Sequence, residues 1–122
     1  MKTNSPATLL RFYLSNTDKF RHAPLSDVIV FAGKRFGLSG ATVIKGSMGY
    51  GSSHVIYSSR LWEITEKLPV IVEFIDETEK IQGFLSSITP WLDKINSGLL
   101  VTSQPLEVVM IKKGSKKNFG LK

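Results

Sequence analysis

Residues 45–53 contain the side chains and glycines of this chain that are best suited to binding chemistry. Their sequence, Lys-Gly-Ser-Met-Gly-Tyr-Gly-Ser-Ser, places Gly46, Gly49 and Gly51 directly after a β-branched run. Glycine is costly in ordered backbone unless a positive φ or a close backbone approach requires it. The segment therefore predicts a loop whose exposed N–H groups meet an anion or a partner. A flexible hairpin without any ligand is the structural alternative.

The glycine spacing differs from two well-known phosphate-binding motifs. A dinucleotide fingerprint runs Gly-x-Gly-x-x-Gly and opens a helix, whereas this segment runs Gly-x-x-Gly-x-Gly and residues 55–57 are predicted to be extended. The segment also lacks a Gly-Lys-Ser/Thr ending, which excludes the phosphate loop of the common NTPases.

The residues around these glycines suggest how an anionic ligand is held. Lys45 and Arg60 flank the loop as candidate phosphate-binding cations, with ordinary surface charge as the alternative. Met48 or Tyr50 offers an apolar wall for a base. His54 is a polar loop group that meets a ligand or partner, or is simply solvated.

Other chemistries are poorly represented. The chain has two histidines and no cysteine, which disfavours a transition-metal site and excludes disulfides, thiol catalysis and iron–sulfur clusters. No nucleophile elbow or paired acids stand out, so we expect a binding protein and not an enzyme. A reducing cytoplasm is the expected setting.

The net charge of +6 is concentrated at the C-terminus. Five lysines and no acid lie in the last eleven residues, and the rest of the chain is nearly neutral. A short lysine-rich tail more often keeps a protein soluble than binds nucleic acid. No signal peptide or membrane-spanning run is evident. The 122 residues predict one domain with flexible tails at 1–7 and 113–122.

The first half of the domain predicts a strand, a helix and a strand. Residues 8–14 alternate, with Leu10, Phe12 and Leu14 on one side. Pro24 suits the first helical position and Gly37 the helix end. The helix face consists of Leu25, Val28, Ile29, Ala32 and Phe36. Residues 41–45 predict the second strand.

The second half repeats this order. Residues 70–75 predict a strand, and Asp76 with Glu79 is a candidate capping pair for the next helix. Pro90 is expected to kink or split that helix, and Gly98 to close it. Its apolar face consists of Ile81, Phe84, Leu85, Ile88, Leu92 and Ile95. Residues 99–102 and 106–111 predict strands on either side of a turn near Gln104 and Pro105.

Two successive strand–helix–strand units predict an α+β ferredoxin-like sandwich, βαββαβ, with a four-stranded antiparallel sheet and both helices on one face. The opposite face is expected to contain Leu9, Tyr13, Ile44, Ile71, Ile75, Val109 and Ile111, with Arg11, Glu73 and Glu107 among them. An exposed apolar patch of this extent indicates an interface, so we expect self-association through it.

Several segments together resemble the PII-like proteins grouped as domain of unknown function 190. They are residues 15–19 (Ser-Asn-Thr-Asp-Lys), 23–25 (Ala-Pro-Leu), 37–43 (Gly-Leu-Ser-Gly-Ala-Thr-Val), 46–51 (Gly-Ser-Met-Gly-Tyr-Gly) and 68–73 (Leu-Pro-Val-Ile-Val-Glu), followed by Asp76. The resemblance runs from about residue 8 to residue 112. It implies a homotrimer with sheets facing inward and a mobile loop at the mouth of an inter-subunit cleft.

In PII signalling proteins this cleft binds adenine nucleotides and the loop contacts target proteins. This chain departs from true PII proteins before and after its last strand, because Lys94 is present near residues 95–100 but no arginine cluster follows. A loop tyrosine equivalent to the uridylylated one is not identifiable, since Tyr50 and Tyr57 occupy different settings. The 190 group has no settled biochemical role, so ligand identity stays open.

The resulting expectation is a small-ligand-responsive regulatory protein that binds an adenine nucleotide, ADP or ATP, between subunits and a protein target through the loop. A trimeric structural or interaction subunit without a ligand is the alternative. An RNA-binding module is disfavoured, because residues 70–75 lack its basic-Gly-aromatic pattern. Residues 49–59 are expected to be mobile without a ligand. The expected ligand-binding residues are Lys45, Gly46, Met48, Gly49, Tyr50, Gly51, His54 and Arg60.

Overall fold

The computed structural model describes residues 1–51, 56–58 and 67–115. Six elements form the main body, in the order β1 (Ser5–Ser15), α1 (Leu25–Phe36), β4 (Ala41–Lys45), β7 (Pro69–Asp76), α2 (Thr78–Leu92) and β8 (Leu100–Val108). Four two-residue strands form two small antiparallel ladders. In one, β2 (Lys19–Phe20) pairs with β3 (Ala23–Pro24), and in the other, β5 (Met48–Gly49) pairs with β6 (Tyr57–Ser58).

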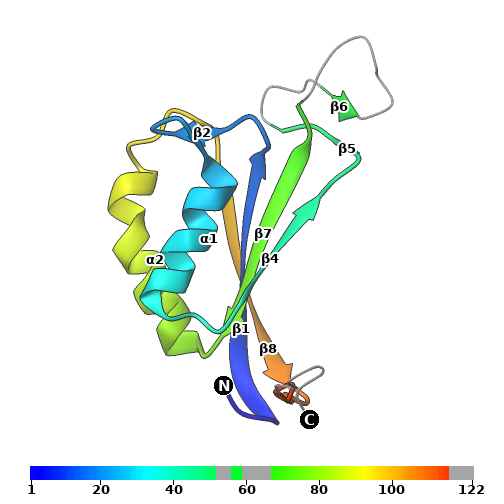
Figure 1. Cartoon of the computed structure of the whole chain (residues 1–122), viewed down its shortest axis with the longest axis vertical. Helices are drawn as coiled ribbons and strands as arrows, with labels where there is room; N and C mark the ends of the chain where they lie inside the picture. Colours follow the sequence, from blue (N-terminus) through cyan, green and yellow to red (C-terminus); the bar gives the residue numbers. More distant parts are fainter. Residues whose placement is uncertain (52–55, 59–66, 116–122) are drawn as a thin grey trace, which may run out of the picture.

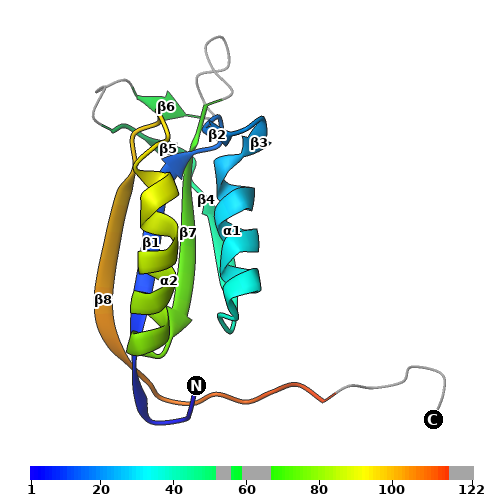
Figure 2. The same ribbon diagram turned by 90° about the vertical axis from the view of Figure 1, so that its left-hand side faces the viewer.

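The four long strands form one antiparallel sheet in the order β4-β7-β1-β8. Both helices cover the same face of this sheet, and the other face is bare (Figures 1 and 2). The predicted ferredoxin-like α+β sandwich is therefore confirmed.

The core lies between the sheet and the two helices. Phe12, Phe74 and Phe84 are fully buried, and the Phe74 ring packs edge-on against both of the others. The predicted inward set Leu10, Phe12 and Leu14 is buried as expected, with Val70 and Val72 beside it. Burying each such side chain contributes roughly 1.5–3 kcal/mol.

Helix α1 ends as the sequence predicts. Gly37 has a φ of 101°, and its N–H donates to the carbonyl oxygens of Gly33 and Lys34. A left-handed C-terminal residue of this kind favours glycine because it has no Cβ to clash. The Lys80 ammonium donates to the Gly37 carbonyl oxygen at 2.7 Å, which links the end of α1 to the first turn of α2.

The start of α2 differs from the prediction. The structure shows no side-chain cap at Glu77, so the proposed Asp76–Glu79 capping pair is wrong. The carboxylate of Asp76 is buried and accepts instead from the N–H of Glu77 at 2.7 Å, the N–H of Ser39 at 2.8 Å and the Ser39 hydroxyl at 3.0 Å. Asp76 therefore holds the loop after α1 against the end of β7.

The prolines of the second half are accommodated without the predicted breaks. Helix α2 runs through Pro90 unsplit and ends at Leu92, six residues before Gly98. Strand β8 is continuous where two strands and a turn were predicted, and Pro105 pairs with Thr8 inside it. Because β8 is an edge strand, its outer side has no ladder bond for proline to break. At the N-terminus β1 already begins at Ser5, which shortens the predicted tail.

The bare face consists of rows of paired residues, because directly opposed residues of antiparallel strands share a face. One row is apolar and crosses all four strands through Ile44, Ile71, Tyr13 and Leu100. The next row is polar and consists of Thr42, Glu73, Arg11 and Thr102. We call these two sets the apolar row and the polar row.

An ion pair occupies the centre of the polar row. The guanidinium of Arg11 donates from Nε to the Glu73 carboxylate at 2.6 Å, and this hydrogen bond raises the pKa of Arg11. Three residues predicted for this face lie elsewhere. Glu107 pairs with Pro6 and so belongs to the helix-covered side, while Val109 and Ile111 follow the end of β8.

Candidate ligand cavity at the end of the sheet

The glycine segment lies beyond one end of the main sheet, where β5 and β6 form a small ladder (Figure 1). Met48 pairs with Ser58 and Gly49 with Tyr57. Among the described residues the segment is thus partly a two-stranded hairpin. The predicted mobility concerns residues 49–59, of which 52–55 and 59 lie outside the described residues, so it stays a prediction.

Two of the three glycines approach Pro69 closely. A Cβ on Gly46 would lie 2.7 Å from the Pro69 Cγ atom, and one on Gly49 would lie 3.2 Å from it. The Gly46 N–H donates to the Pro69 carbonyl oxygen at 2.8 Å. The requirement for glycine at position 46 is therefore steric, and it arises from the close approach of the Pro69 ring. A Cβ on Gly51 would project into open space, with no contacting atom within 4 Å.

A cavity of about 560 Å³ opens between this segment and the end of the sheet. Its wall is built from four separate stretches of the chain that meet at the end of β1. The lining residues are Tyr13, Leu14, Ser15, Asp18, Gly49, Tyr50, Gly51, Lys67, Pro69, Gly98, Leu99 and Leu100. A volume of this size is typical of a small-molecule site.

Hydrogen bonds fix the corner of the cavity where β1 turns toward β2. The Asp18 carboxylate accepts from the Ser15 N–H at 2.9 Å, and the Asp18 N–H donates to the Ser15 carbonyl oxygen. Asn16 forms two hydrogen bonds with Leu68. The Asn16 N–H donates to the Leu68 carbonyl oxygen at 3.0 Å, and the Asn16 side-chain oxygen accepts from the Leu68 N–H at 2.8 Å. These bonds hold the entry to β7, and with it Lys67, beside the end of β1.

The lining combines opposite charges with apolar walls. Lys67 supplies an ammonium group, Asp18 a carboxylate, and Tyr13, Leu99 and Leu100 apolar surface. An ammonium group binds phosphate or carboxylate oxygens, whereas a carboxylate accepts from hydroxyl or amino groups. The arrangement is suited to a ligand with an anionic end and a donor-bearing, partly apolar body.

The structure places the predicted binding residues in three groups. Gly49, Tyr50 and Gly51 line the cavity. Lys45, Gly46 and Met48 do not; Lys45 pairs with the buried Val70, which places it on the helix-covered side of β4. His54 and Arg60 lie outside the described residues.

Sequence reasoning does not select the other lining residues. Asp18 enters only as part of the resembling segment at 15–19, and residues 98–100 enter only in the comparison with true PII proteins. The available signal is the pair of resembling segments at 15–19 and 68–73, which the structure brings together. Within the described ranges no cluster of three His, Cys, Asp or Glu side chains is positioned to hold a metal. No described helix is long and apolar enough to cross a membrane.

Comparison with solved structures defines the class of protein. CPII from Thiomonas intermedia K12, in a structure described as bound to ADP and bicarbonate, matches with a TM-score of 0.60 and 18% identity over 86% of this chain and 90% of its own. A putative PII-like signaling protein from Thermus thermophilus also gives a TM-score of 0.60, with 21% identity over 86% and 91% of the two chains. The chain therefore has a PII-like fold.

Sequence comparison places the chain within that class. It belongs to the DUF190 family, described as Uncharacterized ACR, which matches residues 7–108. A UPF0166 protein of Aquifex aeolicus is 36% identical over 103 residues, covering 84% of this chain and 93% of the relative. A UPF0166 protein of Methanocaldococcus jannaschii is 36% identical over 95 residues, covering 78% and 85%. The resemblance stated from the sequence is confirmed.

Proposed function

We propose that this chain is a PII-like regulatory subunit that binds an adenine nucleotide in the cavity at the end of the sheet and contacts a protein target through the loop after β4. The observation that carries the proposal is the cavity itself, which is lined jointly by Gly49, Tyr50 and Gly51 and by residues 98–100. That CPII, which shares the fold, is described as bound to ADP supports the ligand class.

The proposed site lies between subunits of a homotrimer. Tyr13 and Leu100 belong both to the cavity wall and to the apolar row of the bare face. A second copy covering that row would therefore also border the cavity. Exposed apolar side chains on one face are the usual mark of such an interface.

Each part of the nucleotide is assigned to particular lining residues. We assign the phosphate groups to Lys67 and to the backbone N–H groups of Gly49 and Gly51, because an ammonium group and glycine-rich backbone both suit oxyanions. We assign the ribose hydroxyl or adenine amino groups to Asp18, because a carboxylate accepts hydrogen bonds from such donors. Tyr50 and Leu100 supply apolar surface for the base. His54 and Arg60 remain predicted contributors from the same loop.

Calorimetric titration with ADP, ATP and AMP tests the proposal. With few fixed cations we expect affinity in the micromolar range, about −8 kcal/mol, and weaker binding at high salt because exposed charges are screened. Lys67→Ala and Arg60→Ala should each lower the affinity through lost charge. Lys34→Ala, an exposed lysine of α1, is the matched control and should leave it unchanged.

The Gly49→Val variant tests the glycine segment separately. A Cβ at this position would lie 3.2 Å from Pro69 Cγ, and a β-branched side chain also restricts the backbone. We expect weakened binding with the fold retained in circular dichroism. Absence of heat with all three nucleotides, or an affinity that neither Gly49→Val nor Lys67→Ala changes, would reject this site and favour the interaction subunit without a ligand.

A further inference from the structure

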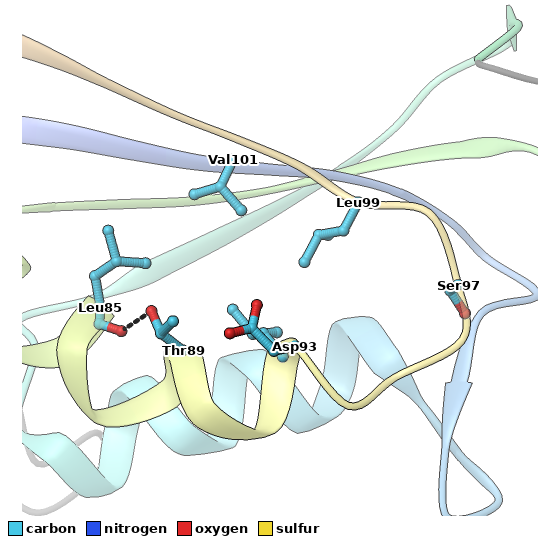
Figure 3. A pocket seen from close by; sticks show the side chains of 7 residues that line it. Leu85, Thr89, Asp93, Ser97, Leu99 and Val101 are labelled. Atoms are coloured by element: carbon cyan, nitrogen blue, oxygen red, sulfur yellow. Dashed lines mark hydrogen bonds between the residues drawn. The ribbon is translucent and has the colours of Figure 1, made fainter.

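A second cavity of about 470 Å³ lies on the helix-covered side of the sheet, between the C-terminal half of α2 and the first residues of β8. We call it the helix groove. Its lining residues are Leu85, Thr89, Leu92, Asp93, Ser97, Leu99 and Val101. Figure 3 shows Leu85, Leu99 and Val101 pointing into the space, with Thr89 and Asp93 along its lower edge.

The polar groups of the helix groove favour a cation. The Thr89 hydroxyl donates to the Leu85 carbonyl oxygen at 2.7 Å, so its oxygen remains available only as an acceptor. The Asp93 carboxylate is exposed, and within the described part of the chain it forms no ion pair. Aliphatic walls with acceptors at the edge suit an apolar segment that carries a positive charge.

The same chain supplies such a segment after β8. Val109 and Met110 are 72% and 74% exposed, among the highest values of the described large apolar side chains. Lys112 and Lys113 follow them, and no acid occurs after residue 107. Residues 109–113, which we call the tail segment, therefore combine exposed apolar surface with two adjacent positive charges. This composition complements the helix groove in both respects.

The tail segment cannot reach the helix groove of its own chain. Strand β8 leads away from the groove, and the chain emerges from the opposite end of the sheet (Figure 2). Returning from Val108 to the level of Val101 requires about 23 Å at the rise of an extended strand. The two residues that lead to Met110 span at most about 7 Å. Any groove that Met110 occupies must belong to another copy.

We propose that the tail segment of one copy docks in the helix groove of a second copy, with Val109 and Met110 on the aliphatic walls and Lys112 or Lys113 beside Asp93. The contact is head-to-tail, so it closes into a ring when the rotation between copies allows it. The proposal does not depend on nucleotide binding, and its test is independent of any ligand.

Disulfide trapping tests this directly, because the chain contains no cysteine of its own. In the Thr89→Cys/Met110→Cys variant, mild oxidation should give intermolecular bands on a non-reducing gel that disappear on reduction. Peptide mapping should identify the 89–110 link. The matched control is Lys34→Cys/Met110→Cys, since Lys34 is exposed on the other helix. Docking raises the local concentration, so we expect the groove pair to cross-link about tenfold faster or more.

Charge exchange provides the second measurement. Asp93→Lys in the Thr89→Cys/Met110→Cys background should slow trapping, and adding Lys112→Glu and Lys113→Glu should restore it. Circular dichroism verifies that each variant is folded. Equal cross-linking rates for the groove and control pairs would overturn the proposal. So would a disulfide found only within single chains, or a rate that the Asp93→Lys change leaves unaltered.

Discussion

Pro69 lies in contact with both the glycine segment and the cavity. Its ring occupies the space that a Cβ on Gly46 would need, and its carbonyl oxygen accepts from the Gly46 N–H. The ring also forms part of the cavity wall. A larger side chain at Gly46 should therefore displace the Pro69 ring, which would alter the cavity wall as well as reduce the stability of the protein.

Gly46→Ala should lower the free energy of unfolding by about 1–3 kcal/mol, the usual cost of overpacking. Gly51→Ala is the matched control, because nothing lies within 4 Å of its Cβ, and it should change stability by less than about 0.5 kcal/mol. Urea denaturation of both variants measures the difference. Equal stability of the two would show that the Pro69 contact relaxes without cost.

Asp76 is the buried charged side chain whose role the structure makes clearest. Burial alone would raise its pKa, but hydrogen bonds from the Glu77 and Ser39 N–H groups and the Ser39 hydroxyl, with the charge of Lys80, hold the pKa below its ordinary value. A lowered folded pKa stabilises the protein above the unfolded value of about 3.9. That contribution is lost as the pH falls through the folded pKa.

Asp76→Asn should therefore destabilise the protein by about 1–3 kcal/mol at pH 7, since it leaves mismatched buried hydrogen-bonding groups. The difference from the unchanged protein should shrink as the pH falls below about 4. Denaturant titrations at pH 7, 5 and about 3.5 measure it, with the exposed Glu107→Gln as control. A difference that stays constant with pH would contradict the ionised, hydrogen-bonded state of Asp76.

At the scale of elements, the contact between α1 and β7 depends on a missing side chain. Gly33 lies in α1 directly against the Phe74 ring, and a Cβ there would lie 2.3 Å from Phe74 Cε1. Glycine inside a helix costs about 1 kcal/mol relative to alanine. The missing side chain lets the helix pack closely against the sheet, and this packing offsets the cost.

Gly33→Ala sets these two effects against each other. The gain in helix propensity is about 1 kcal/mol, and forcing the Phe74 ring aside costs about 1–3 kcal/mol. We expect net destabilisation and a lower melting temperature. Adding Phe74→Leu should make the alanine less costly, which a double-mutant cycle measures. A more stable Gly33→Ala protein would mean that the ring moves freely.

The elements themselves could largely be predicted from the sequence, because alternation and helical spacing are local signals. Leu10, Phe12 and Leu14 identified the inward side of β1, and Gly37 identified the end of α1. The errors occurred where tertiary context decides. Pro90 is tolerated near the end of α2, and Pro105 is tolerated because β8 lies at the edge of the sheet. Asp76 is held by Ser39, 37 residues away, which no local pattern reveals.

The cavity was only partly predictable for the same reason. Gly49, Tyr50 and Gly51 are marked by their spacing, so they could be selected from the sequence. Asp18 and Lys67 carry no such signal. They border the cavity because the bonds between Asn16 and Leu68 join two segments that are 52 residues apart.

At the scale of the whole molecule, the bare face of the sheet is the proposed contact between copies. Leu100 is 58% exposed at the end of the apolar row, and Phe31 is 57% exposed on the surface of α1. The two side chains are thus equally exposed but lie on opposite sides of the protein.

Leu100→Glu should weaken the proposed homotrimer, because a buried charge without a partner costs several kcal/mol. Phe31→Glu is the control and should leave the assembly intact. Light scattering during size-exclusion chromatography gives the mass of each at micromolar concentration. A trimer unaffected by Leu100→Glu would place the contact elsewhere, and a monomer before any substitution would contradict the proposed homotrimer.

Pro105 has a consequence for how this protein behaves when it is concentrated. An uninterrupted nine-residue edge strand would be a template on which further chains add without limit. Because proline has no N–H, a neighbouring strand cannot continue its ladder past the middle of β8. Pro105 therefore interrupts strand addition along the β8 edge of the sheet and counters the growth of amyloid-like fibrils there.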